Sequence, residues 1–85
     1  MIRVVLVDDH AMIRRGLRET LAECGDIQIV GEAGDYASLR NLLRETPVDV
    51  LVLDLNLPGR SGIDVLKALA GDEDAPRVVV LSQYP

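Results

Sequence analysis

Three short apolar runs, each followed by acidic or hydroxyl residues, constrain the fold of this 85-residue chain most strongly. Residues 2–7 lead into Asp8 and Asp9, residues 50–53 lead into Asp54, and residues 77–81 lead into Ser82. Runs of this length without polar alternation are typical of strands that are buried on both faces. Since helix-like segments separate them, we expect a parallel sheet, whose neighbouring strands need long crossover connections.

The segments between these runs have helical spacing, with one additional strand. Apolar residues recur every three or four positions in three stretches, and residues 27–33 favour a more exposed strand. The predicted inward-facing residues of the three helices are Ile13, Leu17, Leu21 and Cys24; Leu39, Leu42 and Leu43; and Ile63, Leu66 and Leu69. Gly25 and Pro47 end the first two helices, and Ser61 with Asp64 resembles a capping box that opens the third. The predicted order is β-α-β-α-β-α-β.

Charge and cysteine content limit the classes of partner. A formal net charge of −5 argues against this segment binding nucleic acid or an anionic membrane, so we expect cations or proteins as partners. Cys24 is the only cysteine, which excludes an internal disulfide, and its helical position favours a buried thiol. The chain start does not have the pattern of a signal peptide, and no apolar run approaches the ~20 residues of a membrane span, which predicts a cytoplasmic protein.

The polar residues that follow the apolar runs predict a metal site. Strand ends in a doubly wound parallel sheet converge on one crevice, so Asp8, Asp9, Asp54 and Ser82 should lie together. Three carboxylates at one edge repel each other unless a hard cation such as Mg²⁺ neutralises them. Mg²⁺ also binds phosphate oxygens, a carboxylate such as Asp54 can act as a nucleophile, and the Ser82 hydroxyl can donate to a phosphoryl oxygen.

Each residue of this set has a simpler interpretation when it is taken alone. Asp8 or Asp9 could cap the following helix, and Asp54 and Ser82 could be loop and turn residues. Their simultaneous occurrence at three strand ends favours the functional interpretation. His10 has no second histidine or cysteine nearby and is predicted to start the helix. The arginines of the first helix are predicted to form its solvated face, not an anion site.

The residues assembled so far resemble the receiver domain of two-component response regulators, and in detail the NarL/FixJ class. The resemblance implies a flavodoxin-like α/β fold, a doubly wound parallel sheet with strand order 2-1-3-4-5. Members of this class usually carry a C-terminal helix-turn-helix domain that binds DNA. The similar motifs are Val4-Val5-Leu6-Val7-Asp8-Asp9-His10, Val30-Gly31-Glu32-Ala33, Asp49-Val50-Leu51-Val52-Leu53-Asp54-Leu55-Asn56-Leu57-Pro58-Gly59 and Val78-Val79-Val80-Leu81-Ser82.

The resemblance also implies a role for each site residue. Asp54 would be the phosphoacceptor, and the phosphate donor would be a phosphohistidine on a sensor histidine kinase. Asp9, Asp54 and the backbone carbonyl of Asn56 would ligate Mg²⁺ directly, whereas Asp8 would hold the ion mainly through water. Ser82 occupies the switch hydroxyl position. Such a domain switches a transcriptional output and is not a turnover enzyme.

The chain departs from the family pattern beyond its fourth strand. A complete receiver continues through a fourth helix, a fifth strand and a fifth helix, so residues 1–85 are predicted to be a partial domain with strand order 2-1-3-4. The family's lysine after strand five has no counterpart, because the only lysine is Lys67 in the third helix. We expect residues 78–80 to form an exposed apolar edge, and the sheet face shared by helices one and five to be half bare. Either the chain is a truncated form that forms homo-oligomers through this surface, or it is a fragment of a longer regulator.

Two other functions remain open at the level of the sequence. One is a pseudo-receiver that cannot be phosphorylated productively and serves as a dimerisation or interaction module. The other is a magnesium-dependent phosphohydrolase, which would need a second acid two residues after the nucleophile, where Asn56 stands.

Overall fold

The computed structural model of the chain describes residues 1–55, 57, 62–70 and 74–81. Four strands and three helices alternate along it, as the apolar runs and helical spacings predict. No helix in this described part has the length and apolar content that a membrane crossing requires. The elements are β1 (Ile2–Val7), α1 (Ala11–Ala22), β2 (Ile27–Ala33), α2 (Tyr36–Glu45), β3 (Val50–Asp54), α3 (Gly62–Leu69) and β4 (Arg77–Leu81).

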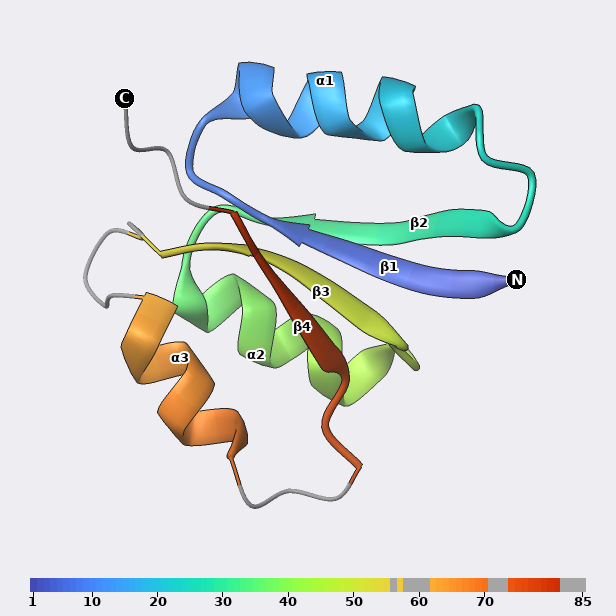
Figure 1. Ribbon diagram of the computed structural model, residues 1–85. Helices are drawn as coiled ribbons and strands as arrows, with labels where there is room; N and C mark the ends of the chain where they lie inside the picture. Colours follow the sequence, from blue (N-terminus) through green and yellow to red (C-terminus); the bar gives the residue numbers. More distant parts are fainter. Residues whose placement is uncertain (56, 58–61, 71–73, 82–85) are drawn as a thin grey trace.

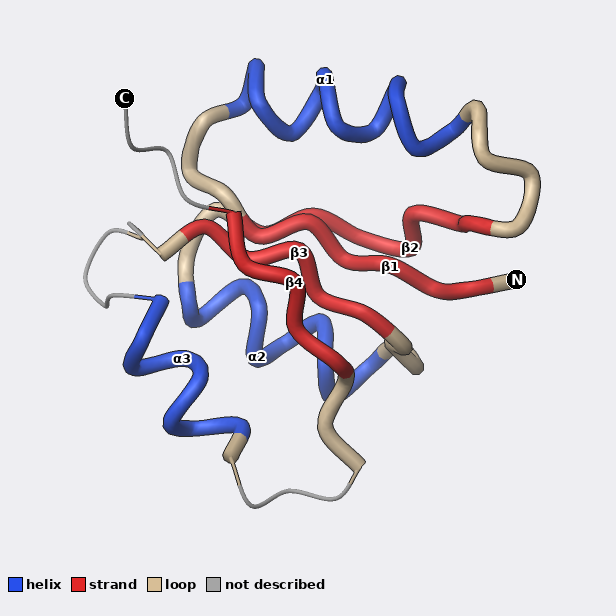
Figure 2. Tube along the Cα trace, in the orientation of Figure 1, coloured by secondary structure: helices blue, strands red, loops and turns tan. Residues whose placement is uncertain are grey.

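The four strands form one parallel sheet in the order β2-β1-β3-β4. Helix α1 lies on one face of the sheet, and α2 and α3 lie on the other (Figure 1). Figure 2 shows the strands as a single layer between these helices. The flavodoxin-like arrangement with order 2-1-3-4 is therefore confirmed. A bulge interrupts the pairing of β1 with β2, where the register shifts between Val4 and Val5.

The core lies between the sheet and helices α2 and α3. Alternate residues of β1 and β3 point into it, because successive side chains of a strand face opposite sides of a sheet. Leu39 of α2 and Val65 of α3 pack against these strand residues and are fully buried. The buried cluster is entirely aliphatic and consists of Val5, Val7, Ala33, Leu39, Leu51, Leu53, Leu57 and Val65.

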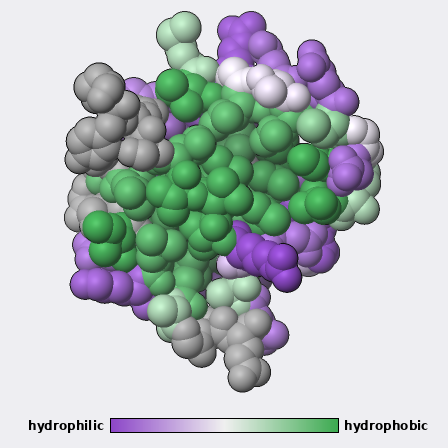
Figure 3. Space-filling view, viewed as in Figure 1, coloured by the Kyte–Doolittle hydropathy of each residue, from purple (hydrophilic) through white to green (hydrophobic). Residues whose placement is uncertain are grey.

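The opposite face of the sheet is much more open. No residue of α1 is buried, and Ile13 on this helix keeps 41% of its surface exposed. On the edge strand β4, Val79 and Val80 are 51% and 42% exposed, as the apolar pattern of that strand predicts. Figure 3 shows hydrophobic residues gathered across this side of the molecule, between the more polar surfaces. The half-bare face and the exposed edge are therefore both present.

Three predicted core positions are wrong: Ile13, which is 41% exposed on α1, Cys24 and Ile63. Cys24 is exposed, because α1 ends at Ala22 and Cys24 lies in the turn that follows, where its N–H donates to Leu21 at 3.0 Å. Ile63 is exposed because the inner side of α3 is centred on Val65. Two residues along an α-helix correspond to roughly 200° of rotation, so Ile63 lies opposite Val65. Ser61, the predicted cap of this helix, lies outside the described residues.

An ion pair joins the amino ends of the two central strands. Asp49, just before β3, accepts from the backbone N–H of Arg3 at 2.8 Å and from its guanidinium at 3.0 and 3.1 Å. These bonds from the Arg3 side chain and backbone lower the pKa of Asp49 from 3.8 to about 2. A carboxyl group with a lowered folded-state pKa stabilises the fold above its unfolded-state pKa and loses that effect as pH falls.

The substitution Asp49→Asn should therefore destabilise the protein in a pH-dependent manner. Its urea midpoint should lie below that of the wild type at pH 7, and the difference should shrink as pH falls from about 4 towards 2. Asp26→Asn, at an exposed turn position, is the control and should change the midpoint little. A wild-type-to-variant difference that stays constant over this pH range would exclude the charge of Asp49 as the cause.

Candidate metal centre

The carboxyl ends of β1 and β3 bring three acidic residues together. Val7 pairs with Leu53 in the parallel register, so Asp8 and Asp54 occupy the next adjacent positions of neighbouring strands. Asp9 follows Asp8 directly in the sequence. One ligand atom from each of these carboxylates and from His10 lies within 4.8 Å of the others. The predicted convergence of Asp8, Asp9 and Asp54, called the acidic cluster below, is present.

The members of the acidic cluster differ in exposure. Asp8 and Asp54 are buried, at 1% and 0% exposure, whereas the Asp9 side chain is 33% exposed. Asp54 and Val52 are two residues apart on β3, so their side chains project from the same face of the sheet. That face carries α1, and the Asp54 carboxylate therefore points away from the aliphatic core. Two buried carboxylates at this separation repel each other, and a bound cation would relieve the repulsion.

The donor set of the acidic cluster fits Mg²⁺. The three residues provide only carboxylate oxygens, which hard cations prefer. Metal–oxygen distances of ~2.1 Å place oxygens of one Mg²⁺ shell at most about 4.2 Å apart. The ligand atoms of the acidic cluster and His10 lie within 4.8 Å of one another, so the three carboxylates are close enough together to surround one hard cation.

Hydrogen bonds to Asp8 fix the start of α1. Its Oδ1 accepts from the backbone N–H of His10 at 2.8 Å and lies 2.9 Å from His10 Nδ1. The hydrogen bond with Asp8 and the nearby charge of Asp9 raise the pKa of His10. His10 is the N-cap residue of α1, which confirms its predicted place at the helix start. No pattern in the sequence predicts that the His10 ring nitrogen lies so close to the carboxylates.

Sequence reasoning missed Arg14. Arg15 is indeed on the solvated face of α1 and pairs with Glu19, but Arg14 is mostly buried. The guanidinium of Arg14 donates to the backbone carbonyl of Asp8, and its Nε lies 3.3 Å from Glu32 of β2. The one signal in the sequence is Glu32 itself, the only charged residue within residues 27–33.

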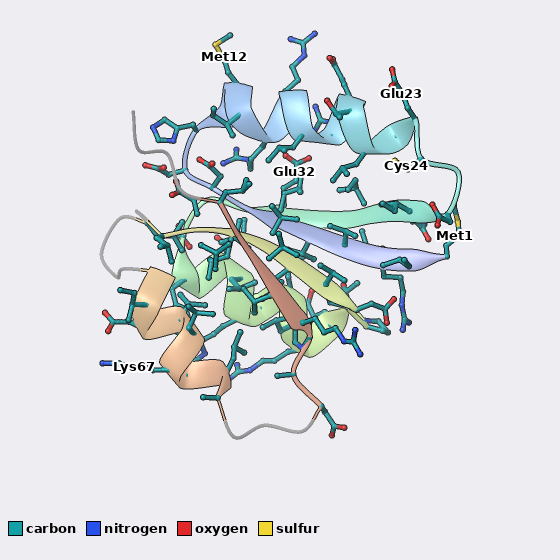
Figure 4. The ribbon with its side chains drawn as sticks, viewed as in Figure 1. Met1, Met12, Glu23, Cys24, Glu32 and Lys67 are labelled. Atoms are coloured by element: carbon teal, nitrogen blue, oxygen red, sulfur yellow. The ribbon has the colours of Figure 1, made fainter. Side chains whose placement is uncertain are left out.

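Two predicted site residues and the single lysine of the sequence remain to be placed. Asn56 and Ser82 lie outside the described residues, so their roles as carbonyl ligand and switch hydroxyl stay predictions. Lys67 lies in the last turn of α3 and points away from the sheet (Figure 4). This position agrees with the expectation that Lys67 cannot replace the family's lysine.

Comparisons with known proteins identify the relatives of this chain. The family described as response regulator receiver domain matches residues 4–85. The nitrate/nitrite response regulator protein NarP of Escherichia coli is 41% identical over 94% of this chain and 37% of its own length. A protein-glutamate methylesterase/protein-glutamine glutaminase of Myxococcus xanthus is 46% identical over 95% of this chain and 23% of its own length.

Solved structures show the same similarity. RcsB from Salmonella enterica serovar Typhimurium, bound to promoter rprA in the presence of the phosphomimetic BeF₃⁻, superposes with a TM-score of 0.91 at 28% identity. The alignment covers 100% of this chain and 72% of that one. Among the sequence relatives, the chain spans less than two fifths of the length of NarP and of the Myxococcus xanthus protein.

Removing one carboxylate of the acidic cluster should stabilise the protein when divalent cations are absent. At an effective dielectric constant of about 20, two charges within 4.8 Å of each other repel by a few kcal/mol. We therefore expect Asp54→Asn to raise the free energy of unfolding by roughly 1–3 kcal/mol. Urea unfolding in EDTA measures the gain. Glu23→Gln removes an exposed negative charge at the far end of α1 and should leave the unfolding free energy nearly unchanged. A less stable Asp54→Asn protein would contradict the repulsion.

Proposed function

Because the chain belongs to the response regulator receiver domain family, we propose that it accepts a phosphoryl group on Asp54 from a phosphohistidine of a sensor histidine kinase. The convergence of Asp8, Asp9 and Asp54 at adjacent strand ends carries this proposal. The function is that of a switch in a two-component system, which changes a transcriptional output in the parent protein. Self-phosphorylation and self-dephosphorylation are the only reactions in this proposal, so the chain is not a turnover enzyme.

The proposed reaction exchanges one bond to phosphorus for another. A carboxylate oxygen of Asp54 attacks the phosphorus, the new P–O bond forms, and the P–N bond to the donor histidine breaks. Asp9, Asp54 and the Asn56 carbonyl would hold Mg²⁺ directly, with Asp8 acting through water. When bound, Mg²⁺ neutralises charge on the phosphoryl oxygens. The Ser82 hydroxyl would then donate to a phosphoryl oxygen and draw the chain after β4 inward.

The burial of Asp54 adds a requirement to this proposal. Its side chain is fully covered, whereas that of Asp9 remains partly exposed to solvent. A phosphodonor must therefore displace neighbouring groups before it reaches the Asp54 carboxylate. Asp9 is the member of the acidic cluster that a cation could reach from solvent.

Two relatives support a proposal for the output of the protein. RcsB binds a promoter in the presence of a phosphomimetic, and NarP is a response regulator. We propose that residues 1–85 form part of a receiver domain, the family that matches residues 4–85. DNA would be bound by an output domain of the parent protein and not by this acidic segment. A cytoplasmic location belongs to the same proposal.

Incubation with a small phosphodonor such as acetyl phosphate tests the phosphoacceptor. In the presence of Mg²⁺, mass spectrometry should detect the addition of one phosphoryl group, because the phosphoryl group forms a covalent bond with the carboxylate. The addition should disappear in Asp54→Asn and in EDTA. Glu23→Gln removes a charge far from the acidic cluster and should be phosphorylated normally.

Two results would contradict this assignment. Phosphoryl addition that persists in Asp54→Asn would place the acceptor elsewhere. Steady release of phosphate from small esters would instead support the phosphohydrolase.

A second candidate function is a phosphorylation-incompetent pseudo-receiver that acts as a dimerisation or interaction module. The exposed valines of β4 favour it, because an unpaired apolar edge strand tends to pair with another chain.

Light scattering tests association through this edge. The wild-type chain should behave as a dimer, and Val79→Lys should shift it to the monomer, because a charged residue on an edge strand opposes pairing. Ile63→Lys introduces the same charge at an equally exposed apolar position on α3 and should leave the dimer intact. A wild-type chain that is monomeric at high concentration would remove this function from consideration.

A further inference from the structure

We propose that Arg14 is a positioning residue that sets the geometry of the acidic cluster for Mg²⁺, with Glu32 holding its guanidinium in place. The proposal rests on the function proposed above only for the identity of the cation. Three observations support the proposal: a hydrogen bond from Arg14 to the backbone of Asp8, an ion pair between Arg14 and Glu32, and the glycine Gly34, which leaves space for the guanidinium.

The contact to Asp8 controls where Asp9 lies. The carbonyl that accepts from Arg14 belongs to the peptide unit that joins Asp8 to Asp9. Because this unit is planar, fixing the direction of the C=O bond also fixes the backbone nitrogen and Cα of Asp9. On the other side of Asp8, its own N–H donates to the carbonyl of Ala33 at 3.0 Å. Arg14 therefore fixes the part of the turn that carries the most exposed carboxylate of the acidic cluster.

Glu32 orients Arg14 from the neighbouring strand. Its Oε1 lies 3.3 Å from Arg14 Nε, and its Oε2 lies 2.5 Å from Arg18 Nη1. The side chains of Arg14 and Glu32 are only 23% and 24% exposed, and Figure 4 shows Glu32 between the sheet and α1. A partly buried ion pair is screened less than a surface pair such as Arg15 with Glu19, which is mainly solvated.

The backbone at Gly34 gives independent support. A Cβ atom at this position would lie 3.3 Å from Arg14 Nη1 and 3.9 Å from the carbonyl oxygen of Asp8. The first distance is tighter than an ordinary van der Waals contact, so the guanidinium would have to shift by a few tenths of an ångström. The absence of a side chain at Gly34 thus leaves the space that Arg14 needs to reach Asp8.

A positioning role and a purely electrostatic role of Arg14 predict opposite changes in Mg²⁺ affinity when the guanidinium is removed. The guanidinium is a positive charge beside a cation site, so its removal should strengthen Mg²⁺ binding if charge alone matters. If Arg14 positions the carboxylates, removal should weaken binding, because groups that orient metal ligands typically change affinity by roughly 10–100-fold. The sign of the change therefore separates the two roles.

Isothermal titration calorimetry with MgCl₂ on the full chain measures this sign. Arg14→Ala should bind Mg²⁺ roughly tenfold more weakly than the wild type. Arg14→Lys keeps the charge but lacks the planar fork that serves both the carbonyl and Glu32, so it should recover only part of the affinity. Arg15→Ala, on the solvated face of the same helix, should bind like the wild type. Unchanged or tighter binding by Arg14→Ala would overturn the proposal.

Two glycine substitutions test the proposal even if Arg14→Ala fails to fold. Gly34→Ala leaves every charge in place and should weaken Mg²⁺ binding by displacing the guanidinium, whereas Gly16→Ala, whose Cβ would meet nothing within 4 Å, should not. Equal affinities for these two variants would overturn the proposal. Failure of phosphorylation in the wild type would count against the function proposed for Asp54 but not against this inference, because Mg²⁺ binding is measured without a phosphodonor.

Discussion

The parallel pairing of β1 with β3 is the constraint on which the acidic cluster depends. Because Val7 lies beside Leu53, the first residue past β1 and the last residue of β3 are neighbours, and both are aspartates. Aliphatic residues of the same two strands are fully buried against α2 and α3. The unfavourable proximity of like charges at the carboxyl edge is therefore imposed by a strand pair whose register the hydrophobic core fixes.

The two faces of the sheet are held to their helices by different interactions. Helices α2 and α3 bury apolar side chains against the strands, as Leu39 and Val65 show. Helix α1 buries none of its residues, and ion pairs from Arg14 and Arg18 to Glu32 join it to β2. Polar contacts of this kind are sensitive to nearby charge, so α1 is the helix whose attachment is most directly linked to the state of the acidic cluster.

The sequence predicted most strand boundaries because polar residues mark them, as Asp8 does after β1 and as Asp54 does at the end of β3. It was less successful where the boundary or the inner face of a helix decides burial. Cys24 continues the helical spacing but follows the end of α1, and Ile63 lies on the outer side of a short helix. Arg14 was missed because its partner Glu32 is distant in sequence, and charge spacing along one helix cannot reveal such a contact.

The bulge in the pairing of β1 with β2 determines the face of the sheet from which Glu32 projects. Before the bulge Val4 pairs with Ile29, and after it Leu6 pairs with Glu32. An unbroken ladder would instead align Glu32 with Val7 and direct its carboxylate into the aliphatic interior. The single extra residue in β2 reverses the side from which Glu32 projects, so that a charge that would disrupt the core instead forms ion pairs with two arginines.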